Sequence, residues 1–213
     1  GAGYSTSGEQ NIPNVVITFS DGTLGTIDFT YPVDAISNEA FAAATNPDGR
    51  GMMFQTEHDC KIDGYWVSLS HTDAGSDWKI SLYTDPTGTP VEVSGSSVTM
   101  LAEQRGGSTT RPYRYIPLPA ELSLSRDTNY AVVVEATGTT NITLTTWTLS
   151  NTAHRAFWPH GAEMVKVTRN DATGAFTAEG AATLLYLMGV RISSFDDGAG
   201  SGGGGGGNGF VSG

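Results

Sequence analysis

The sequence predicts an all-β protein: an antiparallel, jelly-roll-like β-sandwich with one short helix and extended N- and C-terminal arms. Many short segments alternate apolar and polar residues with period two, which places one face of a strand on a core and the other in water. Turn residues separate these segments at regular spacing. Only 15% of the residues are charged and Gly, Ser and Thr are abundant, a composition that suits strands and turns better than long helices.

The first segments predict a hairpin followed by the short helix. Residues 15–19 and 26–31 have strand patterns on either side of a turn at 20–22, so we expect them to pair. Residues 37–44 form the best helical run in the chain, with Ser37 as a candidate N-cap.

The central strands are predicted at 52–55, 61–69 and 78–83, with 130–135 as their later partner. Trp66 has the largest side chain of the 61–69 segment, and we expect it to be buried, which would contribute on the order of a few kcal/mol. Further strands are predicted at 98–101, 113–118, 142–149, 164–168, 184–188 and 190–192.

The simplest partition is one sandwich domain over residues 15–193 with an arm at each end. No repeat of fixed period is present, so a solenoid or a propeller is not expected. Residues 1–14 form the N-terminal arm, and residues 194–213 form a glycine-rich C-terminal arm.

The C-terminal arm is a candidate contact with a partner. Glycine loses more backbone entropy on ordering than any other residue, so an ordered arm needs a surface that holds it. A neighbouring subunit is the favoured surface, and packing along the arm's own domain is the alternative. The candidate partner-binding residues are Tyr4, Asn208, Phe210 and Val211, with Phe210 and Val211 as an apolar plug.

Charge and composition argue against several classes of protein. The net charge of −11 disfavours binding to nucleic-acid phosphates. No apolar run approaches the roughly 20 residues that cross a bilayer, and no basic-then-apolar leader is present, so we expect a cytosolic product without membrane insertion. Cys60 is the only cysteine, which leaves no intramolecular disulfide.

Metal binding is not expected. The 57–60 segment, Glu-His-Asp-Cys, contains possible ligands, but adjacent strand residues point to opposite faces and cannot share one ion. Asp73, Asp77 and Asp85 lie near turns and lack the ligand spacing of a hand-type calcium site. His71, His154 and His160 add no ligand pattern.

Catalytic motifs are absent as well, and we expect neither an enzyme nor a cofactor. There is no Gly-x-Ser-x-Gly elbow, and the glycine run lacks the Lys and Ser/Thr of a phosphate loop. Cys60 has the pattern of a small buried residue rather than a reactive thiolate. A glycosidase-type pair could be drawn from four carboxylates, none of them favoured: Glu57, Asp59, Asp63 and Glu135.

Aromatic residues leave open a glycan-binding role. Exposed Trp or Tyr side chains next to the polar loop at 103–112 could form a sugar-stacking platform, although most aromatics of a sandwich belong to its core. The candidate glycan-binding residues are Trp158, Tyr113 and Arg111.

The order of segments from 51 to 193 resembles a jelly-roll module of bacteriophage structural and appendage proteins. The resemblance rests on an early Gly-Met-Met-Phe at 51–54, an apolar strand at 62–69, a strand ending Leu-Tyr at 80–83 before Asp-Pro-Thr-Gly, and the Asn-Tyr-Ala-Val-Val region within 122–134. It contains no catalytic motif, so fold alone does not assign a function.

The resemblance implies a non-enzymatic virion protein of the capsid decoration, head-fibre or tail accessory type, made in the host cytoplasm. Its partners would be other copies of the chain, the major capsid protein or a tail protein, and the arms would lie on these neighbours. A glycan-binding adhesin or carbohydrate-binding module that recognises host-surface glycan is the second hypothesis. A glycosidase-like or lyase-like enzyme is the third.

Overall fold

The structure, a computed structural model, describes residues 15–18, 24–27, 33–41, 48–56, 58–70, 77–100, 113–137, 142–149, 165–170, 173–179 and 184–196. Throughout these ranges the regular secondary structure is β-strand, joined by turns and bends. None of the described residues forms a helix long and apolar enough to cross a membrane.

One sheet has seven strands in the order β13–β12–β4–β10–β6–β7, and β8 also pairs with β6. All pairings in it are antiparallel. Its strands are β4 (Gly49–Phe54), β6 (Trp78–Thr84), β7 (Val91–Glu92), β8 (Val98–Met100), β10 (Tyr130–Ala136), β12 (Val165–Arg169) and β13 (Thr177–Glu179).

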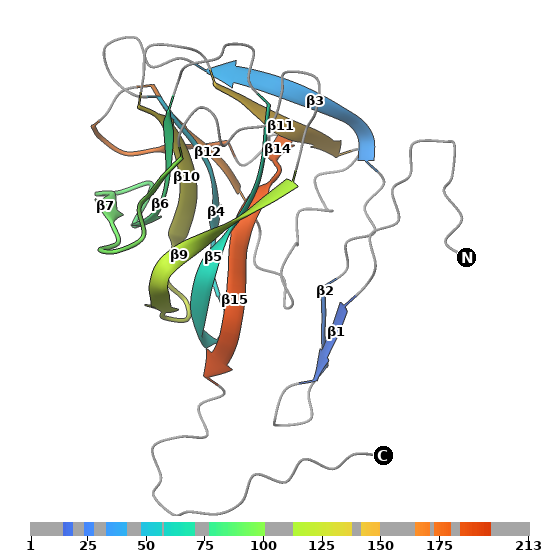
Figure 1. The fold of residues 1–213 in the computed structure, drawn as a ribbon, viewed down its shortest axis with the longest axis vertical. Helices are drawn as coiled ribbons and strands as arrows, with labels where there is room; N and C mark the ends of the chain where they lie inside the picture. The colour runs from blue at the N-terminus through green and yellow to red at the C-terminus, as the bar shows by residue number, and fades with distance from the viewer. Residues whose placement is uncertain are drawn as a thin grey trace, which may run out of the picture.

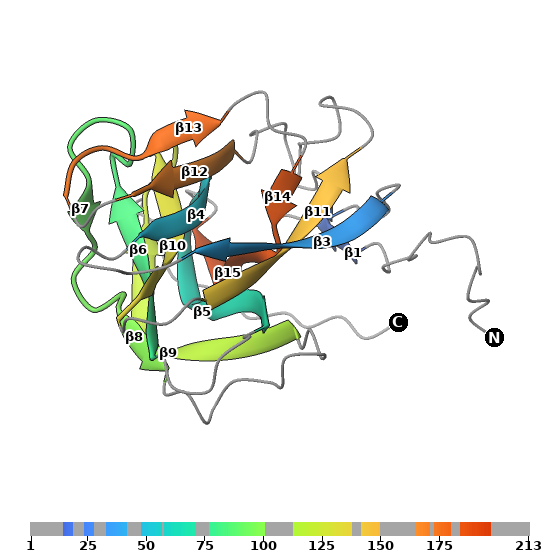
Figure 2. The ribbon, with the colours of Figure 1, turned by 90° about the horizontal axis from the view of Figure 1, so that it is seen from above.

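The second sheet has six strands, in which β14, β11, β5 and β15 follow one another, β3 pairs with β11, and β9 pairs with β5. Figures 1 and 2 show the two sheets facing each other as a β-sandwich, which confirms the prediction of an all-β, antiparallel sandwich. The strands are β3 (Val33–Phe41), β5 (Asp59–Ser70), β9 (Tyr113–Leu124), β11 (Ile142–Leu149), β14 (Leu184–Tyr186) and β15 (Met188–Asp196).

The predicted N-terminal hairpin is also present. β1 (Val15–Thr18) pairs antiparallel with β2 (Leu24–Ile27), and the two form a sheet of their own.

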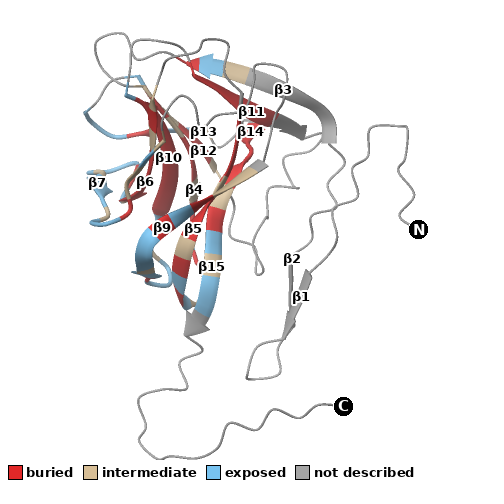
Figure 3. Ribbon diagram, in the orientation of Figure 1, coloured by how far each residue is buried: buried red, intermediate tan, exposed pale blue. Residues whose placement is uncertain are grey.

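The core lies between the two sheets, and β10 is its central strand. Figure 3 shows β10 buried along its whole length between β4 and β6. Val132 and Val134 face the main core, while Ala131 and Val133 face a smaller apolar cluster that also contains Phe176. Both faces of this strand are therefore covered, which explains its nearly continuous apolar sequence.

The predicted helix at 37–44 is wrong for residues 37–41, because these lie in β3. The strand pairs with β11 from Phe41, opposite Ile142, back to Val33, opposite Leu149. Phe41 is buried in the core. Helix propensity is a weak preference that cross-strand pairing and burial override. Residues 42–44 lie outside the described residues.

The prediction that Trp66 occupies the core is also wrong. Cys60 and Ile62 face the core, and so do Tyr65 and Val67, which means that the inward positions change from even to odd numbers. The change occurs at a bulge, where the registers of both β9 and β15 against β5 shift around residue 63. A one-residue shift moves side chains to the opposite face, so Trp66 points outward and is partly exposed.

β15 extends the sheet further than the expected start of the C-terminal arm at residue 194. Ser194, Phe195 and Asp196 pair with Lys61, Cys60 and Asp59 of β5. Because they pair with β5, residues 194–196 belong to the sandwich and not to the C-terminal arm.

Candidate binding surface

Three neighbouring strands, β9, β5 and β15, present a group of aromatic and charged side chains on the outer face of the six-stranded sheet. Trp66 and Tyr115 lie opposite each other on β5 and β9. Their ring centroids are 5.1 Å apart, and the planes are inclined by 49°. Asp63 and Arg191 lie beside them, and we call these four residues the Trp66 cluster.

Gly64 allows the Tyr115 ring to lie against the backbone of β5. A Cβ atom at this position would lie 2.7 Å from Cζ of Tyr115 and 2.6 Å from the carbonyl oxygen of Ile116. Real Cβ atoms do not approach backbone oxygens so closely, so any other residue here would push β9 away. The glycine thus fixes how the aromatic pair sits on the sheet.

Arg191 is fixed by Asp63 and stacks on Tyr115. Its guanidinium forms an ion pair with Oδ2 of Asp63, and its Cζ lies 4.5 Å from the centroid of the Tyr115 ring. The Tyr115 hydroxyl donates a 3.0 Å hydrogen bond to the Asp63 carbonyl oxygen. Because 48% of the Arg191 side chain remains exposed, the guanidinium is oriented yet still reachable from solvent.

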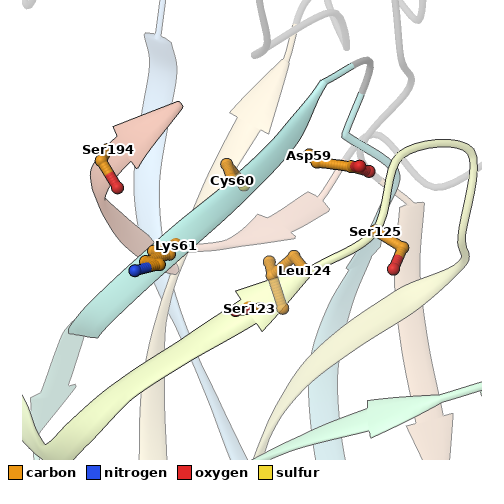
Figure 4. Close-up of a pocket in the computed structure, with 7 residues that line it drawn as sticks. All are labelled: Asp59, Cys60, Lys61, Ser123, Leu124, Ser125 and Ser194. Carbon is orange, nitrogen blue, oxygen red and sulfur yellow. The ribbon is translucent and has the colours of Figure 1, made fainter. Parts of the chain in front are cut away.

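A shallow hollow of about 410 Å³ opens at the start of β5. Ser194, Lys61 and Ser123 form one row across β15, β5 and β9 at this point. Figure 4 shows the side chains that surround it, which come from these strands and the turn after β9. We call it the polar hollow, and its lining residues are Asp59, Cys60, Lys61, Ser123, Leu124, Ser125 and Ser194.

The thiol in the polar hollow is not an activated nucleophile. Cys60 is buried and belongs to the main core, which confirms its predicted structural role. Burial raises its pKa to about 11, and the charge of Asp59 acts in the same direction. The thiol is therefore protonated at neutral pH.

Asp59, which also lines the polar hollow, accepts a 2.7 Å hydrogen bond from the backbone N–H of Arg126.

A second charged group lies on the outer face of the seven-stranded sheet, around the buried carboxylate of Glu135. Arg169 lies 2.6 Å and Lys79 lies 2.9 Å from its oxygens. Tyr83 donates a 3.0 Å hydrogen bond to it. Phe176 covers this group, with its ring 4.3 Å from the Arg169 guanidinium. Glu135 is therefore a buried carboxylate with each of its two oxygens paired with a cation.

A third charged group connects β3 of the six-stranded sheet with strands β12 and β4 of the seven-stranded sheet. Glu39 lies 2.8 Å from Nζ of Lys166 and 3.3 Å from Nε of Arg50, and it accepts a 2.8 Å hydrogen bond from Tyr186. Burial raises the pKa of Glu39, but the hydrogen bonds from Lys166 and Tyr186 and the positive charges outweigh it and hold the pKa below its ordinary value. Burial, together with Glu39, raises the pKa of Tyr186.

The structure separates two of the candidate glycosidase carboxylates, Asp63 and Glu135. Asp63 lies on the outer face of one sheet and is paired with Arg191, while Glu135 lies on the outer face of the other. Within the described ranges, no three His, Cys, Asp or Glu side chains are grouped as metal ligands. Asp85 instead accepts a 2.8 Å hydrogen bond from the N–H of Thr89 within a tight turn.

Most of the other candidate site residues lie outside the described residues, and their predictions remain open. Tyr113 is the exception in part: it begins β9, where its backbone pairs with Ser68, but its side chain is not described. The residues outside are Tyr4, Asn208, Phe210, Val211, Trp158, Arg111, Glu57, Asp73, His71, His154 and His160.

The Trp66 cluster was missed by the sequence analysis, which placed Trp66 inside. One signal was available: an isolated glycine within a strand pattern, here Gly64, often marks a bulge. Comparison with known proteins adds no assignment, because no family model, no curated protein and no solved structure matches this chain.

Proposed function

We propose that this protein is a non-enzymatic structural component of a bacteriophage virion, of the capsid decoration, head-fibre or tail accessory type. It would be made in the host cytoplasm and assembled into the particle through its β-sandwich and its terminal arms. Its partners would be other copies of the chain, the major capsid protein or a tail protein.

One observation carries this proposal: the segments that resemble the phage module are the central strands of the sandwich. Residues 51–54 lie in β4, 80–83 lie in β6, and 130–134 lie in β10, and these three strands are neighbours in one sheet. Residues 62–69 lie in β5, the central strand of the other sheet. The resemblance therefore concerns the core of the fold.

The charged groups support binding and assembly over catalysis. Glu135, Glu39 and Asp63 are each held by one or more cations, so these carboxylates are committed to holding strands together. The hydrogen bonds and positive charges around Glu39 also hold its pKa below the ordinary value, which makes it a poor proton donor at neutral pH.

The arms would supply the contacts between subunits. An extended arm adds contact area on a neighbour without a large preformed interface, although ordering it consumes part of the gain. Since β15 ends at Asp196, we assign this role at the C-terminal end to residues 197–213, which include Phe210 and Val211.

The test compares the full chain with a variant that ends at Asp196. We expect light scattering to give an oligomeric mass for the full chain and a monomeric mass for the variant, with the same thermal unfolding transition for both. The double variant Phe210→Ser, Val211→Ser keeps the length of the arm and is expected to weaken the oligomer. Equal masses for the full chain and the truncated variant would refute assembly through this arm.

A further inference from the structure

We propose that the Trp66 cluster and the polar hollow together form a binding site for a neutral glycan chain that lies along β5. This role goes beyond the proposed assembly function and does not depend on it. The site involves only described residues on one outer face of the sandwich, whereas the test of assembly concerns the C-terminal arm.

The two parts of the site lie on one strand and face the same side. The row of Lys61, Ser123 and Ser194 crosses β5 near its start, and Trp66 follows five residues later. At about 3.3 Å per residue this distance is roughly 16 Å, somewhat less across the bulge. A surface of this length accommodates more than one sugar ring, which favours a chain over a monosaccharide.

The side chains offer the two kinds of contact that a sugar requires. The C–H face of a pyranose packs on an aromatic ring, and Trp66 lies on the outer face of the sheet and is only partly buried. Hydroxyl groups both donate and accept hydrogen bonds. Arg191 provides oriented donors beside the rings, and the Lys61 ammonium and the serine hydroxyls provide donors and acceptors at the hollow.

Asp63 positions Arg191 rather than binding the ligand. Its Oδ2 atom is paired with the guanidinium. Its other oxygen, Oδ1, is enclosed and accepts no hydrogen bond within the described part of the chain. Asp63 therefore holds Arg191 in place, and the Arg191 guanidinium is the group that reaches the ligand.

The charge of the surface favours a neutral glycan. Arg191 is balanced by Asp63, and Lys61 lies 3.9 Å from Glu121. The whole chain has a net charge of −11, so a polyanion such as a nucleic acid would be repelled. The fully buried core of a protein interface is mostly apolar and depleted in charged residues, whereas this face places two rings among charged and polar side chains.

The bulge at residue 63 supports a functional role for the two partly exposed rings. It turns Trp66 from the core to the surface and leaves Gly64 under Tyr115. Bulges are common next to binding sites, because one extra residue re-aims a side chain without breaking the sheet.

The experiment titrates the full chain with soluble malto-, cello- and chito-oligosaccharides and follows tryptophan fluorescence and heat of binding. We expect saturable binding to at least one of these neutral probes and weaker binding to polygalacturonate, an anionic glycan. Trp66→Ala and Arg191→Ala should each lower the affinity at least tenfold, and Trp66→Tyr should retain most of it. Val91→Ala, an exposed residue on the other sheet, is the matched control and should bind normally.

Thermal unfolding of each variant shows whether it is folded, so a loss of binding can be distinguished from a loss of folding. The glycan proposal is overturned if no neutral probe binds, if both variants bind as the wild type does, or if polygalacturonate binds best. A change in oligomeric mass of Trp66→Ala would identify the surface as a subunit contact and would also overturn it. The variant that ends at Asp196 should bind glycan with the same affinity as the full chain. Glycan binding and assembly are therefore tested separately, and one proposal can fail while the other holds.

Discussion

At the scale of single residues, two glycines on one face of the sheet have opposite roles. Gly64 lies under the Tyr115 ring, where a Cβ atom would meet that ring and the Ile116 carbonyl oxygen. Gly189 lies on the neighbouring strand β15, opposite Trp66, and has open space where a Cβ atom would be. Only Gly64 is required by its surroundings.

Gly64→Ala should therefore destabilise the protein by about 2 kcal/mol, because the backbone of β9 cannot yield without losing its pairing with β5. Gly189→Ala should change the unfolding free energy by less than about 0.5 kcal/mol, since nothing opposes the added methyl group. Urea denaturation measures both. If the two variants are equally stable, the close packing of Tyr115 on β5 is incorrect.

At the scale of elements, β3 is attached to the opposite sheet through Glu39. The strand is an edge strand that pairs only with β11 among the described strands, and Glu39 reaches Lys166 of β12, Arg50 of β4 and Tyr186 of β14. Lys166 is nearly buried, with 8% of its side chain exposed, so the loss of the carboxylate charge leaves an enclosed cation with less compensation.

This attachment predicts a stability contribution that depends on pH. The pKa of Glu39 is lower in the folded than in the unfolded chain, so its contribution is complete above its ordinary pKa of 4.5 and is lost as the pH falls through the folded value. Glu39→Gln should cost on the order of 1–2 kcal/mol at pH 7, and the difference from the wild type should shrink below pH 4.5.

Thermal denaturation between pH 7 and pH 3 measures this difference. Glu121→Gln is the matched control, because that side chain is half exposed and lies 3.9 Å from Lys61. Exposed ion pairs contribute little to stability, so Glu121→Gln should have the same thermal stability as the wild type at every pH. If the difference in thermal stability between Glu39→Gln and the wild type stays constant from pH 7 to pH 3, the charge of Glu39 does not stabilise the attachment of β3.

At the scale of the whole molecule, two sheets enclose one main core, and a second apolar cluster covers β10 from outside. Phe176 contributes to that outer cluster, and its ring packs 5.4 Å from Tyr83. The other sheet depends on β15, which pairs with β5 over most of its length, from Met188 to Asp196. Asp196 is therefore the last described residue that pairs in this sheet.

Truncation tests this limit. Removal of everything after Asp196 should leave the unfolding free energy unchanged, because no described pairing is lost. Removal of everything after Ser193 also removes three paired residues of β15 and should cost about 1–3 kcal/mol. Urea denaturation compares the two chains, and equal stability would mean that the pairing of Ser194, Phe195 and Asp196 adds nothing to the fold.

The sequence predicted most strands because their alternation is local. β6, β10 and β11 were expected within a residue or two of their observed positions. β3 was predicted as a helix at 37–41, since Asn, Glu and Ala carry no strand preference and only pairing with β11 decides their conformation. The Trp66 cluster was missed because a bulge is set by the strands on either side of it.

What the sequence determined by itself was the fold class, the central strands and the buried role of Cys60, because periodicity and composition act along the chain over a few residues. The tertiary structure alone decided which face each side chain occupies and which residues meet. Trp66 reached the surface, and Glu39 reached cations on two other strands, because strand register and the packing of one sheet on the other are set by partners distant in sequence.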